Sequence, residues 1–333
     1  MRPILLAGLL AAISSPASAA PSPEIVFKLK SSIVKIHTVT KSGGHGVGSG
    51  VVVAKEQVAT NCHVLADAAG VNVTAYGETY RPETIKEDWH HDICLLQIKY
   101  LPLTPAELGD SEQLQYEQPV FSIGFPGGPA RPLTTQGNIK ALYPMDDSFI
   151  IRTSSSFMLG ASGSAVFDAN GKLIGLNTVK SPGHQAYYYA VPVKWVKQLL
   201  EAPGSTKIGY PGTPFWDAPE NNWPYFMRVV GPTQHARWAE LKAIAETWTG
   251  EDPRNAEAHY YLGLAQQNLG EVIKARHEFN TAIQLNGRHT ASMRALSIIA
   301  TQIGDQAEAQ RLALQLQELD ALDELQAELT TTP

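Results

Sequence analysis

The chain has 333 residues, enough for two domains, and 44% of them are hydrophobic, which excludes a largely disordered protein. The formal net charge is −6 at pH 7 and the charges are spread along the chain, so nothing in the composition indicates nucleic-acid binding.

Residues 1–19 have the pattern of a secretory signal peptide. Arg2 precedes an apolar run over residues 4–13, and small residues at 17 and 19 favour cleavage before Ala20. A run of about ten apolar residues is too short to span a bilayer, and no later run is longer. We therefore expect an exported protein, periplasmic or secreted, without a membrane span.

Residues 24–202 have the pattern of one domain made mostly of strands. A short helix is expected over 24–30, and from residue 33 short β-rich runs alternate with turns. About eleven such runs indicate an all-β barrel or sandwich. They are residues 33–39, 50–54, 58–61, 71–76, 93–98, 120–125, 137–142, 149–153, 165–168, 173–178 and 186–192. A helix over 193–201 is predicted to close the domain.

Three polar motifs within this domain point to acyl transfer. Ser162 lies among small residues, and Gly160 permits a tight turn that aims the N–H groups of Gly160 and Ser162 at one point, as an oxyanion needs. His63 and Asp92 stand upstream. A serine hydroxyl needs a base such as imidazole, and the imidazole needs a carboxylate to orient it.

These motifs carry a family resemblance over residues 33–200. In order, the chain has Gly48-Ser49-Gly50, Thr60-Asn61-Cys62-His63, Asp92-Ile93-Cys94-Leu95-Leu96 and Gly160-Ala161-Ser162-Gly163-Ser164. This resembles trypsin-like (chymotrypsin-fold) serine peptidases, most of all the bacterial high-temperature-requirement type. The resemblance implies an all-β double barrel of two six-stranded barrels, with His63 and Asp92 on the first barrel and Ser162 on the second.

Each member of the implied triad has rivals. His45, His90 and His91 compete with His63, and Asp88 competes with Asp92. Ser164 competes with Ser162 and stands where the family usually has glycine. The family motif favours His63, Asp92 and Ser162, with Gly160 and Ser162 as the oxyanion donors.

The resemblance also implies a substrate pocket, with Ser156, Phe157 and Met158 on one wall and Tyr188, Tyr189 and Ala190 on the other. Because no acid falls at the base of this pocket, we expect a small or medium apolar residue before the scissile bond rather than Lys or Arg. Tyr188 stands where a small residue is common and could narrow the cleft.

Cys62 and Cys94, the two cysteines of the chain, flank His63 and Asp92. If His63 and Asp92 meet, the cysteines are neighbours, either as a disulfide in an oxidising compartment or as two buried thiols. Their spacing to histidines does not suggest zinc, and no metal or cofactor is implied.

Two further segments follow the β-rich domain. Residues 203–232 are rich in proline and aromatic side chains, so a linker without regular helix is expected, packed against one or both domains. Residues 233–329 have helical periodicity and a repeat of 34 residues, with a first helix over 233–249 and a capping helix over 317–329. Leu262, Gly270 and Ala275 recur as Leu296, Gly304 and Ala309. The period resembles tetratricopeptide repeats, the alternative being a plain helical bundle.

The sequence thus predicts an exported serine endopeptidase that acts on polypeptides, with a separable all-α helical-repeat domain that recognises proteins. The main alternative is a catalytically silent peptidase fold that acts as a scaffold through its repeats. A chaperone-like role is less favoured, because many relatives carry a C-terminal peptide-binding module that this chain lacks.

Overall fold

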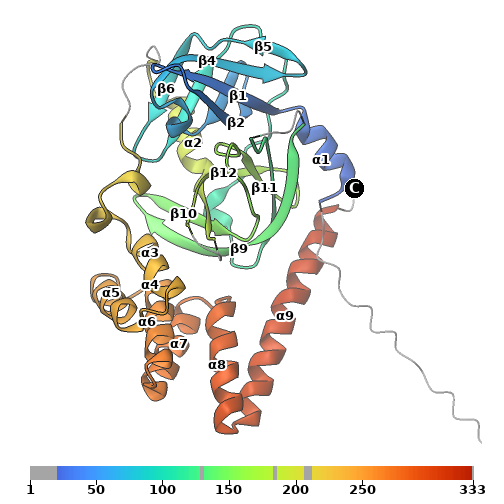
Figure 1. The fold of residues 1–333 in the computed structure, drawn as a ribbon. Helices are drawn as coiled ribbons and strands as arrows, with labels where there is room; N and C mark the ends of the chain where they lie inside the picture. The colour runs from blue at the N-terminus through green and yellow to red at the C-terminus, as the bar shows by residue number, and fades with distance from the viewer. Residues whose placement is uncertain (1–20, 128–130, 183–185, 206–211, 332–333) are drawn as a thin grey trace, which may run out of the picture.

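The computed structural model describes residues 21–127, 131–182, 186–205 and 212–331, with side chains as far as residue 319. The expected signal peptide therefore lies outside the described residues. Figure 1 shows the two β-rich halves together, with the C-terminal helices on one side of the second half. No helix within the described ranges is long and apolar enough to cross a membrane.

The first half is a seven-stranded antiparallel sheet in the order β5-β4-β1-β2-β3-β7-β6. Its strands are β1 (Ile33–Thr40), β2 (His45–Ala54), β3 (Gln57–Thr60), β4 (Ala68–Ala75), β5 (Glu78–Tyr80), β6 (Thr84–Asp88) and β7 (Ile93–Gln97). A six-stranded barrel was expected here. The two strands at the ends of the sheet, β5 and β6, were not predicted, because β5 is very short and β6 has one buried apolar residue, Ile85.

The second half is a closed six-stranded barrel in the order β10-β13-β12-β11-β8-β9, as expected. Its strands are β8 (Pro119–Gly124), β9 (Leu133–Met145), β10 (Ser148–Thr153), β11 (Ala165–Asp168), β12 (Leu173–Lys180) and β13 (Tyr188–Pro192). Each strand supplies one buried apolar residue to a common cluster, namely Val120, Ile139, Ile151, Val166, Ile174 and Ala190. Because these six side chains come from all six strands and contact one another, they fill the interior of the barrel.

Two helices accompany the sheets where they were expected. Helix α1 (Pro23–Lys30) starts with proline in its first turn, where the missing N–H costs no hydrogen bond. Helix α2 (Val193–Glu201) follows β13 directly and buries Val193, Trp195 and Val196. It thereby packs against both β6 and β12.

The proline-rich segment contains short helices, so the expectation that it lacks regular helix is wrong. It forms η3 (Phe215–Asp217), η4 (Glu220–Asn222), α3 (Tyr225–Arg228) and α4 (Val230–Gln234). The prolines fit because Pro214, Pro219 and Pro224 stand at the N-caps of these turns. A proline at such a position removes no intrahelical hydrogen bond.

The remaining helices are α5 (Trp238–Glu251), α6 (Ala256–Asn268), α7 (Val272–Leu285), α8 (Thr290–Ile303) and α9 (Gln306–Thr331). Helix α5 begins at Trp238 rather than at residue 233, because the chain turns at Ala236, whose φ is 54°. Gly270 and Gly304 both have φ near +80° and lie in the turns that follow α6 and α8. Ala275 is fully buried between α7 and its neighbours.

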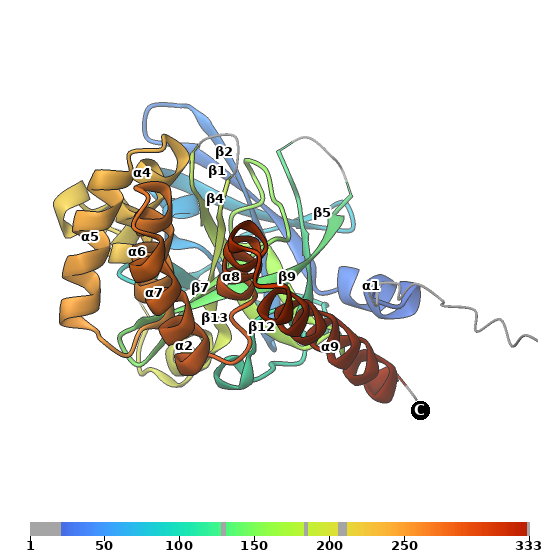
Figure 2. The same ribbon diagram turned by 90° about the horizontal axis from the view of Figure 1, so that it is seen from below.

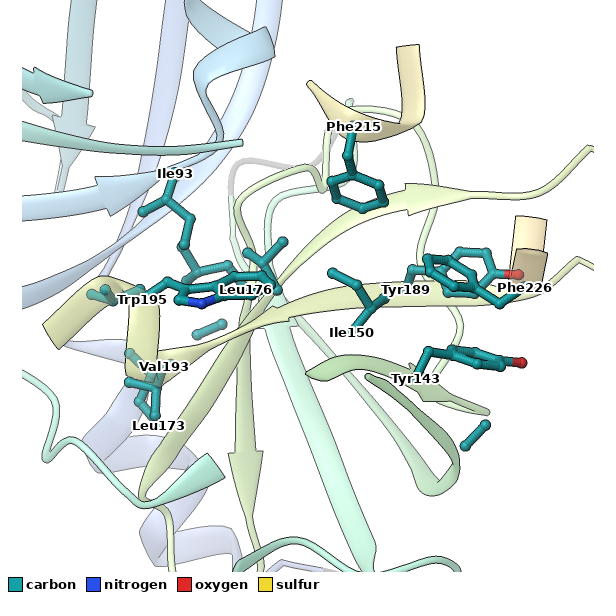
Figure 3. Packing of buried hydrophobic residues seen from close by; sticks show 14 of the residues in the cluster. Ile93, Tyr143, Ile150, Leu173, Leu176, Tyr189, Val193, Trp195, Phe215 and Phe226 are labelled. Atoms are coloured by element: carbon teal, nitrogen blue, oxygen red, sulfur yellow. The ribbon is translucent and has the colours of Figure 1, made fainter. Parts of the chain in front are cut away.

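The helical region and the barrel share one hydrophobic core. Phe226 of α3 stacks on Tyr143 of β9, with ring centroids 4.5 Å apart, and Trp248 of α5 packs on Tyr261 of α6 in the same cluster. Figure 3 shows Phe226 beside Tyr143 and Tyr189, and Figure 2 shows α5, α6 and α7 side by side.

A buried polar network lies in the same interface. Arg152 of β10 donates to the hydroxyls of Tyr143 and Tyr261, and Tyr116 donates to Glu257 of α6 at 2.9 Å. Burial by itself raises the pKa of Glu257, but hydrogen bonds from His289 and Tyr116 and the charge of Arg152 lower it below its usual value. A separable helical domain was expected, whereas this interface is buried and hydrogen-bonded.

Candidate active site

His63 and Asp92 meet at one end of the paired strands β3 and β7 of the first sheet. His63 lies in the short helix η1 (Cys62–Leu65) directly after β3, and Asp92 ends the turn that leads into β7. The His63 ring Nδ1 is 2.7 Å from Asp92 Oδ2, and the His63 backbone N–H donates to Asp92 Oδ1 at 2.9 Å. Asp92 is fully buried, while a quarter of the His63 side chain is exposed.

The backbone around Asp92 is held in an unusual conformation. Asp92 has φ of 60°, which is uncommon for a residue other than glycine. Its carbonyl oxygen accepts from the Asn61 side chain at 3.0 Å, and its Oδ2 also accepts from Thr178 of β12 at 2.5 Å. The Trp216 indole donates to the same oxygen at 3.1 Å.

Ser162 lies in the loop between β10 and β11 and is half-buried. The backbone N–H of Ser49 in β2 donates to the Ser162 carbonyl at 2.8 Å, which ties this loop to the first sheet. Gly160 has φ of +89°, and a Cβ there would lie 2.4 Å from the backbone of Gly127, so the turn requires glycine. Among the described residues, the N–H groups of Gly160 and Ser162 donate to no acceptor.

The structure distinguishes Ser162 from its rival Ser164. Ser164 is 2% exposed, and its hydroxyl accepts a hydrogen bond from Asn177 of β12 at 2.9 Å. Within the described residues no hydrogen bond joins Ser162 to His63. Such a bond is often long in a free site and tightens when substrate binds.

The rival histidines have other surroundings. His45 is exposed at the start of β2, and His91 stacks on Trp195 and is hydrogen-bonded to Asp88. In the described part of the chain, one group of His and Asp could hold a metal ion: His90, His91 and Asp146. Their ligand atoms already hydrogen-bond to one another, which accounts for the cluster without an ion.

Cys62 and Cys94 are joined by a disulfide with their Cα atoms 4.9 Å apart. The bond connects the residue before His63 to β7, two residues after Asp92. A cross-link at this position ties together the two segments that carry the imidazole and the carboxylate.

The six residues expected at the substrate pocket do not all face one pocket: three lie in the loop after β10 and three in β13. The Phe157 and Tyr188 rings meet with centroids 5.3 Å apart, and Met158 is exposed. Ser156 is exposed as well. Ala190, in contrast, lies in the barrel interior.

Tyr189 points away from this pocket. Its ring packs on Phe226 and lines a cavity of ≈ 240 Å³ with Val179 and Trp216. Successive side chains of a strand alternate in direction, which explains why three consecutive residues of β13 do not share a wall.

Sequence reasoning missed three residues that contact the site. Ser49, part of the Gly48-Ser49-Gly50 motif, donates its backbone N–H to the carbonyl oxygen of Ser162. Thr178, at the end of a predicted strand, and Trp216, noted only as an aromatic residue of the linker, both donate to Asp92. For Trp216 the sequence carries no such signal, because it lies 124 residues from Asp92.

The chain is also similar to known proteins over the part that holds this site. Residues 48–176 match the family described as trypsin-like peptidase domain. The chain is 32% identical over 179 residues to the periplasmic serine endoprotease DegP of Salmonella typhimurium, covering 47% of this chain and 37% of that protein. It is 33% identical over 168 residues to the periplasmic pH-dependent serine endoprotease DegQ of Escherichia coli, covering 47% and 37%.

The chain carries a bacterial DegP-like, trypsin-like peptidase domain. It spans only about a third of the length of these curated relatives. Among solved structures, the Rv3671c protease of M. tuberculosis in its active form is similar in fold, with a TM-score of 0.51 and 21% identity over 61% of this chain and 99% of that one.

Proposed function

We propose that this chain is an exported serine endopeptidase in which Ser162 is the nucleophile, His63 the general base and Asp92 the residue that orients His63. Gly160 and Ser162 supply the backbone N–H groups of the oxyanion hole. The arrangement of His63 and Asp92, with 2.7 Å between Nδ1 and Oδ2, is the observation that carries the proposal. The DegP-like peptidase domain and the unused N–H groups of Gly160 and Ser162 support it further.

The proposed reaction follows from this geometry. Because Nδ1 of His63 is engaged by Asp92, Nε2 is left to take the proton of the Ser162 hydroxyl as Oγ bonds to the substrate carbonyl carbon. The resulting oxyanion accepts from the two free N–H groups. His63 then gives its proton to the leaving amine as the C–N bond breaks. His63 then takes a proton from a water molecule, whose oxygen bonds to the acyl carbon. As the bond between that carbon and Ser162 Oγ breaks, His63 gives the proton to Oγ and the acid product leaves.

The surroundings of Phe157 and Tyr188 support a preference for a small or medium apolar residue before the scissile bond. Phe157 and Tyr188 pack on each other and narrow the space, and neither brings a charge. We infer that replacing Tyr188 with alanine admits larger side chains. Profiling cleavage sites in a peptide library with the two forms tests this.

The helical region is proposed to contact protein substrates or partners. It leaves several large apolar side chains exposed, among them Ile273 at 87% and Ile298 at 53%. Export is supported by the pattern of residues 1–19 and by the word "periplasmic" in the names of the relatives.

Covalent labelling by a fluorophosphonate tests the enzyme against the silent scaffold. The full chain should label, Ser162→Ala should not, and Ser164→Ala should still label, because the Ser164 hydroxyl is buried on Asn177. The labelled peptide should contain residue 162 by mass spectrometry. A folded wild-type chain that neither labels nor cleaves an unstructured polypeptide would favour the scaffold.

A further inference from the structure

One side chain of the proline-rich linker reaches the centre of the candidate site. Trp216 belongs to the segment 212–217, here called the strap, which contains η3 (Phe215–Asp217). The strap lies against the turn that precedes Asp92. The Phe215 backbone N–H donates to the His90 carbonyl at 3.1 Å, and Gly212 lies close to Trp89.

Trp216 contacts both His63 and Asp92. Its indole N–H donates to Asp92 Oδ2 at 3.1 Å. Its ring stands edge-on to the His63 ring, with centroids 5.1 Å apart and an interplanar angle of 90°. One side chain therefore holds the carboxylate and covers the imidazole at the same time.

Asp92 Oδ2 accepts from three parts of the fold at once. His63 belongs to the first sheet, Thr178 to the barrel and Trp216 to the strap. Donors from several directions fix the rotation of the carboxylate and hence the direction of the imidazole it orients. The indole ring also limits access of water to the His63–Asp92 hydrogen bond, which strengthens that bond.

The strap is held in place by the helical side of the molecule. Phe215 is buried beside Trp216, and its ring packs near Phe226 with centroids 6.3 Å apart. Phe226 in turn stacks on Tyr143 in the core that the barrel shares with α5 and α6. The position of Trp216 thus depends on packing that the peptidase domain does not supply alone.

We propose that Trp216 is a positioning residue that acts on His63 through Asp92, so that the linker and helical region contribute to catalysis and not only to recognition. This inference rests on the proposed function. It differs from the expectation that the helical region is separable from the bond chemistry.

The test compares two tryptophans of the same linker in the full chain. Trp216→Phe removes the indole N–H that Asp92 accepts while it keeps an aromatic ring. Trp223→Phe is the matched control, because the Trp223 Nε1 is buried and without a hydrogen-bond partner. Each variant is first shown to be folded by its thermal midpoint, and kcat and KM are then measured on a peptide substrate. The NMR resonance of the proton between His63 Nδ1 and Asp92 Oδ2 is recorded as well.

Trp216→Phe should lower kcat by roughly 10- to 100-fold, the scale of a misplaced catalytic group, with little change in KM. The resonance should shift, and Trp223→Phe should alter neither measurement. A kcat within about twofold of wild type, a rise in kcat, or a fall in kcat without a shift of the resonance would each overturn the proposal. The resonance can be recorded in a chain that does not turn over substrate. An inactive wild-type chain would therefore refute the proposed function, whereas the shift of the resonance in Trp216→Phe would still show whether Trp216 positions His63 through Asp92.

Discussion

The shared core between the barrel and the helical region predicts a large effect for Phe226→Ala. Phe226 is 2% exposed and packs on three rings, those of Tyr143, Tyr189 and Phe215. Truncation of a buried phenylalanine costs about 3–5 kcal/mol. Here Tyr143 and Tyr189 are buried and held by strands, so the cavity cannot collapse easily. We expect the free energy of unfolding to fall by about 4 kcal/mol.

Guanidinium denaturation followed by tryptophan fluorescence and circular dichroism measures this change. Phe27→Ala is the matched control, because Phe27 on α1 is 82% exposed and its truncation should change stability by less than about 0.5 kcal/mol. If the core is shared, the barrel and the helices should unfold together in the wild type. A loss below about 1 kcal/mol in Phe226→Ala would refute the reasoning that this side chain joins the two parts.

Three further predictions concern the surroundings of the site. Asp92→Asn should leave the chain folded but lower kcat by about 10⁴-fold, since it favours the wrong imidazole tautomer; a decrease below about tenfold would contradict this. Replacing both Cys62 and Cys94 with alanine should cost about 3 kcal/mol of unfolding free energy by denaturation, and an unchanged midpoint would argue against the bond. His91→Gln should destabilise the protein more at pH 6 than at pH 9, measured by thermal unfolding. Burial lowers the His91 pKa, but the hydrogen bond and charge of Asp88 outweigh it and the pKa is raised. Protonated His91 therefore stabilises the folded protein below about pH 6.5, and this stabilisation is lost as the pH rises through the pKa of His91 in the folded state. An equal destabilisation by His91→Gln at both pH values would contradict this.

Much of the fold follows from local patterns in the sequence. Strands β1, β11 and β13 and helix α2 are short apolar or amphipathic runs bounded by turns, so their positions could be predicted within a few residues. Strands β5 and β6 could not, because their few apolar residues gain strand structure only by pairing with β4 and β7. Proline disfavours helix interiors, so the sequence does not predict the short helices of the linker. In the structure Pro214, Pro219 and Pro224 stand at N-caps, where proline removes no intrahelical hydrogen bond.

The order of the motifs is enough to propose the catalytic candidates, but it does not predict the residues that hold them in place. Tertiary pairing alone decides that Thr178 lies on Asp92, since it requires the end of a barrel strand to meet a turn of the first sheet. The same holds for the pocket. Tyr188, Tyr189 and Ala190 are consecutive in sequence, yet the strand directs them to different sides.

What the sequence by itself determined is therefore a set of local patterns: a serine among small residues, a histidine after a strand, an aspartate before a strand, and an internal repeat of 34 residues. What only the tertiary structure decided is which residues far apart in the sequence contact each other, and hence how the linker and helices support the peptidase domain. The contact of Trp216 with Asp92 spans 124 residues, and the contact of Tyr116 with Glu257 spans 141. Contacts at such separations leave no periodic or local signal in the chain, because they depend on how whole elements pack.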